Sequence, residues 1–322
     1  MDIILVCHTE FGMVKNRKVV ADRRFKEGAL VGITNLLKIC EKYGVKATLA
    51  VMPEVAEYLP KKIDHEVALH IHPGWQEFRK ENDNFFIGDK FLREHCRQSF
   101  ESTFLCDYSY AEQREMIEQG KRYLENIFDR PVVSFVAGRW SLNSDTVRAL
   151  VDIGITHDCS APAHLKSQGY DWSRLPRICL PYHPASSDYQ QRGELPFLIV
   201  PISQFLLGGN VNPEAVIEVG SGWLNGCFLE YYQQDLPLFH ICLHSPCLLS
   251  TYFYDVLEKF LGFIVRHRNI KFKFASEIHE YDIPSTWHAK DKILPYLVRL
   301  NSKIICSGIK TIVKKTKLWP VS

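Results

Sequence analysis

Several signatures of common enzyme and binding classes are missing from this 322-residue chain. None of its ten cysteines belongs to a C-x-x-C pair, so neither a zinc finger nor a thioredoxin-type redox site is indicated. The Walker A motif, the dinucleotide-binding G-x-G-x-x-G pattern and the nucleophile elbow of serine hydrolases are also absent, and Gly220-Ser221-Gly222 is followed by the wrong spacing. The sequence therefore does not predict nucleotide binding or serine hydrolase chemistry.

The chain also lacks a strong charge bias and any apolar run long enough to span a membrane. Its net charge is only +2, with 46% hydrophobic and 24% charged residues, which is ordinary for a soluble globular protein. The first apolar run, Ile3 to Cys7, is too short for a signal peptide and reads as a first strand. Several cysteines lie inside apolar runs, as reduced core residues do. We therefore expect a cytoplasmic protein.

Strands and helices alternate from Met1 to about Glu280, which predicts a parallel sheet covered by helices. Segments 15–26 and 74–110 show no such periodicity, and we interpret them as a basic loop and a long inserted loop with one or two short helices. Strands are expected near residues 2–8, 46–52, 65–73, 132–136, 155–160, 195–203, 238–243 and 271–275, and the main helices near 30–40, 112–128, 141–153, 213–224 and 252–267. Seven or eight strands in about 280 residues favour a barrel over an open sheet.

We expect residues 1–283 to form the main domain and residues 284–322 to form a separate C-terminal extension. Between Lys290 and Lys317 there are eight lysines and arginines and one acid, and apolar residues recur at helical spacing. Two interpretations are open: a helix on an anionic membrane surface, or a helix packed on the body with a solvated basic face. Aromatic residues are sparse there, so we do not expect nucleic-acid binding.

Polar residues follow the predicted strands at the end where sites gather in parallel sheets. His70 and His72 are two residues apart at the end of a strand, so both are expected to project from one face. With Glu10 they would form a two-histidine, one-carboxylate site for zinc or another divalent metal such as nickel, cobalt or manganese. The other polar residues near strand ends are His8, Thr9, Arg139, Trp140, Asp158, His183, Asp188 and His244.

These residues together are typical of a hydrolase. His244 would stand opposite the metal as an acid for the leaving group. Arg139 would either hold an anionic part of the substrate or form an ion pair with Asp158. The predicted substrate contacts are Trp75, Trp140, Asp158 and His183.

The order of these motifs resembles the polysaccharide deacetylase superfamily, carbohydrate esterases with a NodB-like distorted barrel. The segment from Glu66 to Pro73 looks like the histidine motif of the branch found in lipopolysaccharide and capsule gene clusters. The segment from Phe135 to Trp140 resembles its arginine motif, and Leu243-His244-Ser245-Pro246 resembles its late leucine-histidine motif. The resemblance covers about residues 1–280 and implies an α/β fold of the distorted (β/α)7-8 barrel type. It also implies metal-dependent removal of an acyl group from a sugar or glycan precursor, with His244 as catalytic acid.

One departure concerns the base. The family has an aspartate after the first strand, whereas this chain has His8, with the acid following at Glu10. Three interpretations of His8 are open. It could act as a base at neutral pH, it could be a further metal ligand, or its presence could mean that the chain binds sugars without turnover. A glycosidase is a weaker alternative, because Glu10 and Asp158 are its only obvious pair of carboxylates.

Overall fold

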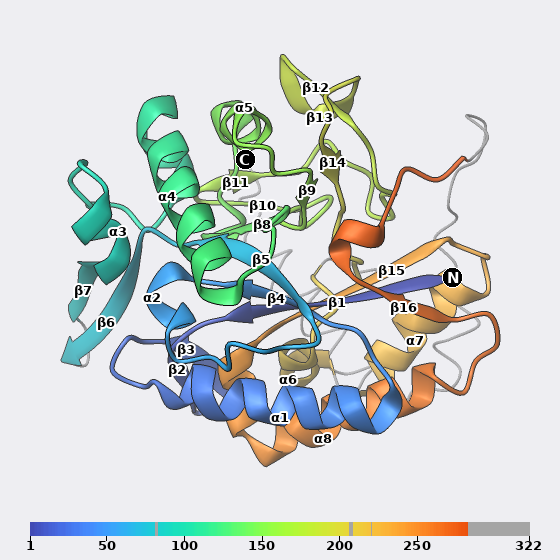
Figure 1. Ribbon diagram of the computed structural model, residues 1–322. Coiled ribbons are helices and arrows are strands. Elements are labelled where there is room, and N and C mark those ends of the chain that lie inside the picture. The colour runs from blue at the N-terminus through green and yellow to red at the C-terminus, as the bar shows by residue number, and fades with distance from the viewer. Residues whose placement is uncertain (81–82, 206–208, 220, 283–322) are drawn as a thin grey trace, which may run out of the picture.

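A computed structural model describes residues 1–80, 83–205, 209–219 and 221–282 (Figure 1). Its centre is a sheet of eight strands in the order β14-β9-β8-β5-β4-β1-β15, with β16 also paired to β1. Every ladder of this sheet is parallel. The strands are β1 (Asp2–Thr9), β4 (Thr48–Val51), β5 (Glu66–Ile71), β8 (Ser134–Ala137), β9 (His157–Asp158), β14 (Leu198–Ile199), β15 (Leu238–His244) and β16 (Lys271–Lys273).

The sheet curls into an incompletely closed barrel. The segment after β14 connects to β15 by single hydrogen bonds instead of a ladder: the Ser203 amide donates to the His240 carbonyl, and the Cys242 amide donates to the Val211 carbonyl. The predicted strand 195–203 shrinks to two residues because Pro196 and Pro201 have no amide proton to donate. The predicted barrel is therefore present, with an irregular closure.

Helices cover the outside of the barrel. They are α1 (Glu27–Tyr43), α2 (Pro53–Ala56), α3 (Lys90–His95), α4 (Tyr110–Phe128), α5 (Ser144–Asp152), α6 (Val216–Val219), α7 (Ser221–Tyr232) and α8 (Thr251–Ile264). In Figure 1, α1 and α8 lie together along the lower side of the sheet, and α4 and α5 lie above it. Sequence signals fix their ends: a Ser109–Glu112 capping box begins α4, and Gly44 ends α1 with φ of 63°.

The side-chain alternation of β1 separates two cores. Ile3, Leu5 and Cys7 belong to the large cluster between sheet and helices, whereas Ile4 and Val6 belong to the small cluster that fills the barrel. Because strand side chains repeat every two residues, His8 continues the barrel-facing row at the carboxyl end. Ala68 and Leu238 also belong to the barrel cluster, so the same alternation brings His70 and His244 to this interior row.

Both segments interpreted as irregular loops contain β-hairpins. Residues 12–21 form β2 (Gly12–Lys15) and β3 (Lys18–Ala21), joined by a two-residue turn in which Asn16 and Arg17 have φ of 52° and 60°. Residues 74–88 form β6 (Gly74–Lys80) and β7 (Asp83–Gly88). The remaining short hairpins are β10 (Lys166–Ser167) with β11 (Tyr170–Asp171), and β12 (Pro184–Ala185) with β13 (Asp188–Arg192).

The predicted C-terminal extension, residues 284–322, lies outside the described residues, and the domain boundary at 283 remains a prediction. Among the helices that the structure describes, none combines the length and the hydrophobicity that a membrane span requires.

Candidate active site

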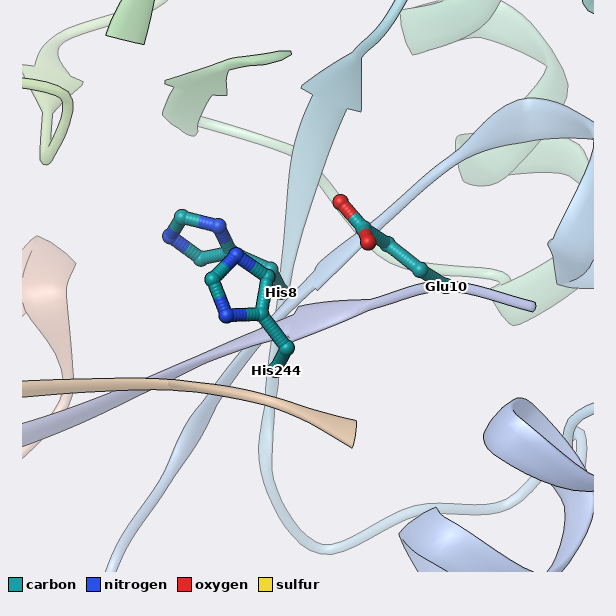
Figure 2. A group of neighbouring side chains, drawn as sticks. All are labelled: His8, Glu10 and His244. Carbon is teal, nitrogen blue, oxygen red and sulfur yellow. The ribbon is translucent and has the colours of Figure 1, made fainter. Parts of the chain in front are cut away.

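Three side chains meet at the carboxyl end of β1 and β15. His8 lies directly opposite His244 in the parallel register of these strands, and their ring centroids are 4.7 Å apart. The carboxylate of Glu10, on the segment that follows β1, is turned towards the two rings (Figure 2). One ligand atom from each of the three lies within 4.8 Å of the others. Ser245 fixes the spacing, because its Oγ accepts from the Glu10 amide at 3.1 Å and donates to the Glu10 carbonyl at 3.2 Å.

His70 contacts the same carboxylate from β5. Its Nδ1 donates to the Val136 carbonyl at 2.9 Å, and its Nε2 lies 3.0 Å from Oε1 of Glu10. Burial raises the pKa of Glu10, but the hydrogen bond from His70 and the charges of neighbouring histidines outweigh burial and lower this pKa to about 2. Glu10 is thus an acceptor, so a proton on Nε2 or a bound cation must lie between the two groups.

These residues fit a divalent metal ion. The donors are a carboxylate and imidazoles, the set that zinc and related ions prefer. The buried Nε2 of His8 has no hydrogen-bond partner within the described structure, and the Nδ1–H of His70 is held by a backbone carbonyl, as is usual for metal-binding histidines. The predicted ligands were Glu10, His70 and His72. The group that the structure brings together also has two histidines and one carboxylate, and Glu10 belongs to both.

His72 lies beside this group but is not one of its three members. It directly follows the last residue of β5, Ile71. The His72 ring lies 6.2 Å from that of His70 and stacks on Trp75 at 6.3 Å, although it still lines the cavity described below. Burial lowers the pKa of His72 to about 3 despite the opposing effect of Glu10. The observed group of possible ligands contains His8 and His244 instead of His70 and His72.

Glu214 is a site residue that sequence analysis missed. It lies in the 3₁₀-helix Pro213–Ala215, where Asn212 caps the helix by accepting from the Ala215 amide. Its carboxylate accepts from the His244 amide at 2.9 Å and from Nδ1 of His244 at 3.1 Å. In the sequence Glu214 looks like an ordinary acid in a first helical turn, so no signal there would have identified it.

The two neighbouring histidines have opposite electrostatic environments. Burial lowers the pKa of His8 well below its ordinary value, and nearby His244 and His70 lower it further. Burial would lower the pKa of His244 as well, but the charge and hydrogen bond of Glu214 raise it to about 9. At neutral pH without a metal, His8 is therefore a neutral acceptor and His244 a charged proton donor.

A cavity of about 830 Å³ opens above these residues. Arg139 and Trp140 line it with left-handed backbone conformations, φ of 53° and 54°, which are costly for residues other than glycine and typical of functional sites. The Cγ of His72 would lie 2.7 Å from a Cβ at position 138, so Gly138 permits this close approach. Trp140 meets Tyr170 edge-on with ring centroids 5.9 Å apart, and Phe104 lies under the Arg139 guanidinium.

The structure does not bring the other predicted substrate contacts into this cavity. Trp75 is buried, and its Nε1 donates to Glu54 at 3.1 Å. Asp158 is buried and accepts from the Ser160 hydroxyl instead of pairing with Arg139, and burial raises its pKa to about 7. Nδ1 of His183 lies 3.0 Å from the carbonyls of Leu195 and Phe197, and Asp188 pairs with Arg174. Neither these three predicted contacts nor Asp188, which was noted only as a polar residue near a strand end, is among the residues that line the cavity.

No protein-family model matches the sequence, and no curated protein matches it. Among solved structures, one that carries the name polysaccharide deacetylase, from Mycobacterium smegmatis, is 18% identical with a TM-score of 0.54, covering 85% of this chain and 88% of that chain. Another of that name, from Pseudomonas aeruginosa PAO1, is 15% identical with a TM-score of 0.56, and Puue allantoinase is 15% identical with a TM-score of 0.57. Each of these two covers 86% of this chain and 88% of its own. The chain therefore has the distorted (β/α) barrel fold of the NodB type that polysaccharide deacetylase structures share.

Proposed function

We propose that the protein is a metal-dependent deacylase that hydrolyses an N-acyl or O-acyl group on a sugar or glycan precursor. The observation that carries this proposal is the group of buried His8, buried Glu10 and half-buried His244 at the mouth of the barrel, beneath a cavity with aromatic walls. The names of the two compared deacetylases support the reaction class.

Glu10, His8 and His244 would hold the metal, with His70 directly beside Glu10. A divalent metal in such a site supplies Lewis acidity and lowers the pKa of water. His8 is neutral and buried, so it is suited either to accept a proton from the attacking water or to bind the metal through its free Nε2. His244, held by Glu214, is suited to donate a proton to the departing amine when it is not itself a ligand.

The upper cavity would bind the sugar. Aromatic faces pack well against sugar rings, and Phe104, Trp140 and Tyr170 all line the cavity. The buried Nε1 of Trp140 has no hydrogen-bond partner within the described residues, so it is a donor available to a sugar or acyl oxygen. Arg139, at the same wall, is placed to hold an anionic or polar part of the substrate.

Acetate release from a panel of N-acetylated and O-acetylated sugars tests this proposal. The wild-type protein, loaded with zinc after chelator treatment, should release acetate from at least one class of substrate. His244→Asn should retain the fold and lose most of this activity, because asparagine can neither supply the proton nor replace the imidazole as a metal ligand. His267→Asn is the matched control, since His267 packs among Phe228, Tyr232 and Phe263, away from the cavity.

A sugar-binding protein without turnover is the second candidate, favoured by His8 in the place of the family's aspartate. It predicts sugar binding with no acetate release, in both the metal-free and the metal-loaded protein. Release of acetate that depends on metal would exclude it.

The proposal extends to the biological setting that the sequence resemblance implies: surface polysaccharide or lipopolysaccharide biosynthesis in the cytoplasm, with residues 290–317 contacting the membrane face. Those residues lie outside the described structure. Sedimentation of the full chain with anionic lipid vesicles, compared with neutral vesicles, tests the membrane contact.

A further inference from the structure

We propose that the sugar bound in this cavity carries a phosphate group, and that Arg17, Lys18 and Arg139 hold this phosphate at the rim. The inference rests on the proposed function, because it names the substrate class of the same cavity. It goes further in assigning a binding role to the turn between β2 and β3.

The three cations reach the cavity from two separate parts of the fold. Arg17 and Lys18 come from the β2–β3 hairpin, and Arg139 comes from the 3₁₀-helix Gly138–Trp140 that follows β8. The carboxylates that line the cavity, Glu10 and Glu214, are each engaged by a histidine. Neither Arg17 nor Lys18 forms an ion pair with any residue that the structure describes. The charges of Arg17 and Lys18 are thus not neutralised by an ion pair within the described residues.

The hairpin that carries Arg17 and Lys18 is held in place. Its two turn residues both adopt left-handed backbone conformations, which suit the twist of a two-residue hairpin. A Cβ at Gly28 would lie 2.5 Å from the Gly12 amide and 2.9 Å from Pro246, so only glycine allows the hairpin, α1 and the segment after His244 to approach so closely. The cations therefore face the cavity from a packed element that is continuous with the site.

A phosphate fits this arrangement better than a neutral or singly charged group. Guanidinium groups bind phosphate oxygens through paired hydrogen bonds, and a lysine adds a point charge. A phosphate monoester carries nearly two negative charges at neutral pH, enough to engage cations from both segments. The aromatic residues lie in the same cavity as this rim, so one molecule with a sugar ring and an attached phosphate can contact both.

Calorimetric titration of the full chain with small probes tests the inference directly. N-acetylglucosamine 1-phosphate should bind about tenfold more tightly than N-acetylglucosamine, and this preference should fall as salt is added. Arg17→Gln/Lys18→Gln should weaken binding of the phosphorylated sugar by about tenfold and leave binding of the neutral sugar within about twofold. Lys61→Gln/Lys62→Gln is the matched control, because these neighbouring lysines are exposed and do not line the cavity.

The other outcomes overturn the inference. Equal affinity for the two sugars, including undetectable binding of both, would show that the rim does not select a phosphate. If N-acetylmuramic acid bound as tightly as N-acetylglucosamine 1-phosphate, the rim would be a site for carboxylates. If inorganic phosphate alone bound as tightly, the rim would be an anion site that does not recognise a sugar. This titration measures binding and does not depend on turnover. A protein that releases no acetate but prefers the phosphorylated sugar would contradict the proposed function and still support the phosphate site.

Discussion

Replacing Glu214 by glutamine isolates the effect of one carboxylate on His244, because the side chain keeps nearly the same shape. Glu214 contacts both the amide and Nδ1 of His244, and these interactions raise the pKa of the histidine to about 9. In the variant the burial that lowers this pKa remains, while its main opposing cause is gone. We expect the pKa of His244 to fall to its ordinary value of 6.5 or below.

The size of the effect follows from the two pKa values. The interval between 6.5 and about 9, at about 1.4 kcal/mol per pKa unit, corresponds to about 3 kcal/mol of folding stability. Because the folded-state pKa is raised, this stability is fully present below pH 6.5 and is lost as the pH rises through 9. Wild type should therefore exceed Glu214→Gln in unfolding free energy by more at pH 6 than at pH 10.

The assay is a histidine NMR titration of the metal-free protein, paired with urea unfolding of both proteins at the two pH values. The His244 ring resonances should titrate near pH 9 in wild type and below pH 7 in the variant. Identical titration curves in the two proteins would refute the reasoning, because they would mean that Glu214 does not set the charge of His244.

Three further predictions concern the site and its support. His8→Ala should lower acetate release at least about 100-fold with an unchanged circular dichroism spectrum, and activity equal to wild type would remove His8 from the mechanism. Gly32→Ala should lower both the melting temperature and the zinc affinity, because its Cβ would lie 2.2 Å from the Ser245 carbonyl oxygen; calorimetry that finds both unchanged would contradict this coupling. Glu230→Ala should cost about 3–5 kcal/mol in urea unfolding, since it leaves the buried Arg177 guanidinium without its carboxylate, and a loss below about 1 kcal/mol would contradict that account.

The strands that hold the site were predictable because their apolar runs are continuous. β1, β5 and β15 were all expected, and the polar residues at their ends do gather at one edge of the barrel. His72 shows the limit of this approach. Its ring stacks on Trp75 and is not among the three side chains whose ligand atoms lie within 4.8 Å of one another, and the two-residue repeat of a strand does not reveal which side chains bring their ligand atoms together.

Glu214 and the β2–β3 hairpin could not be inferred for different reasons. Glu214 reaches His244 from a segment 30 residues earlier in the chain, and only the tertiary fold brings the two together. The hairpin turn uses Asn16 and Arg17 where glycine would usually mark such a turn, and its flanking strands have four residues each. Local sequence therefore located the strand-end histidines but not the partners that set their charge.

Metal content is the measurement that tests the central claim most directly. Wild type and Glu10→Ala would each be incubated with zinc, dialysed and analysed by elemental mass spectrometry, with circular dichroism to confirm that the variant is folded. The account predicts about one equivalent of zinc in wild type and almost none in the variant, because Glu10 supplies the only carboxylate of the proposed site. Wild-type protein that retains no zinc, or a folded variant that retains as much as wild type, would contradict it.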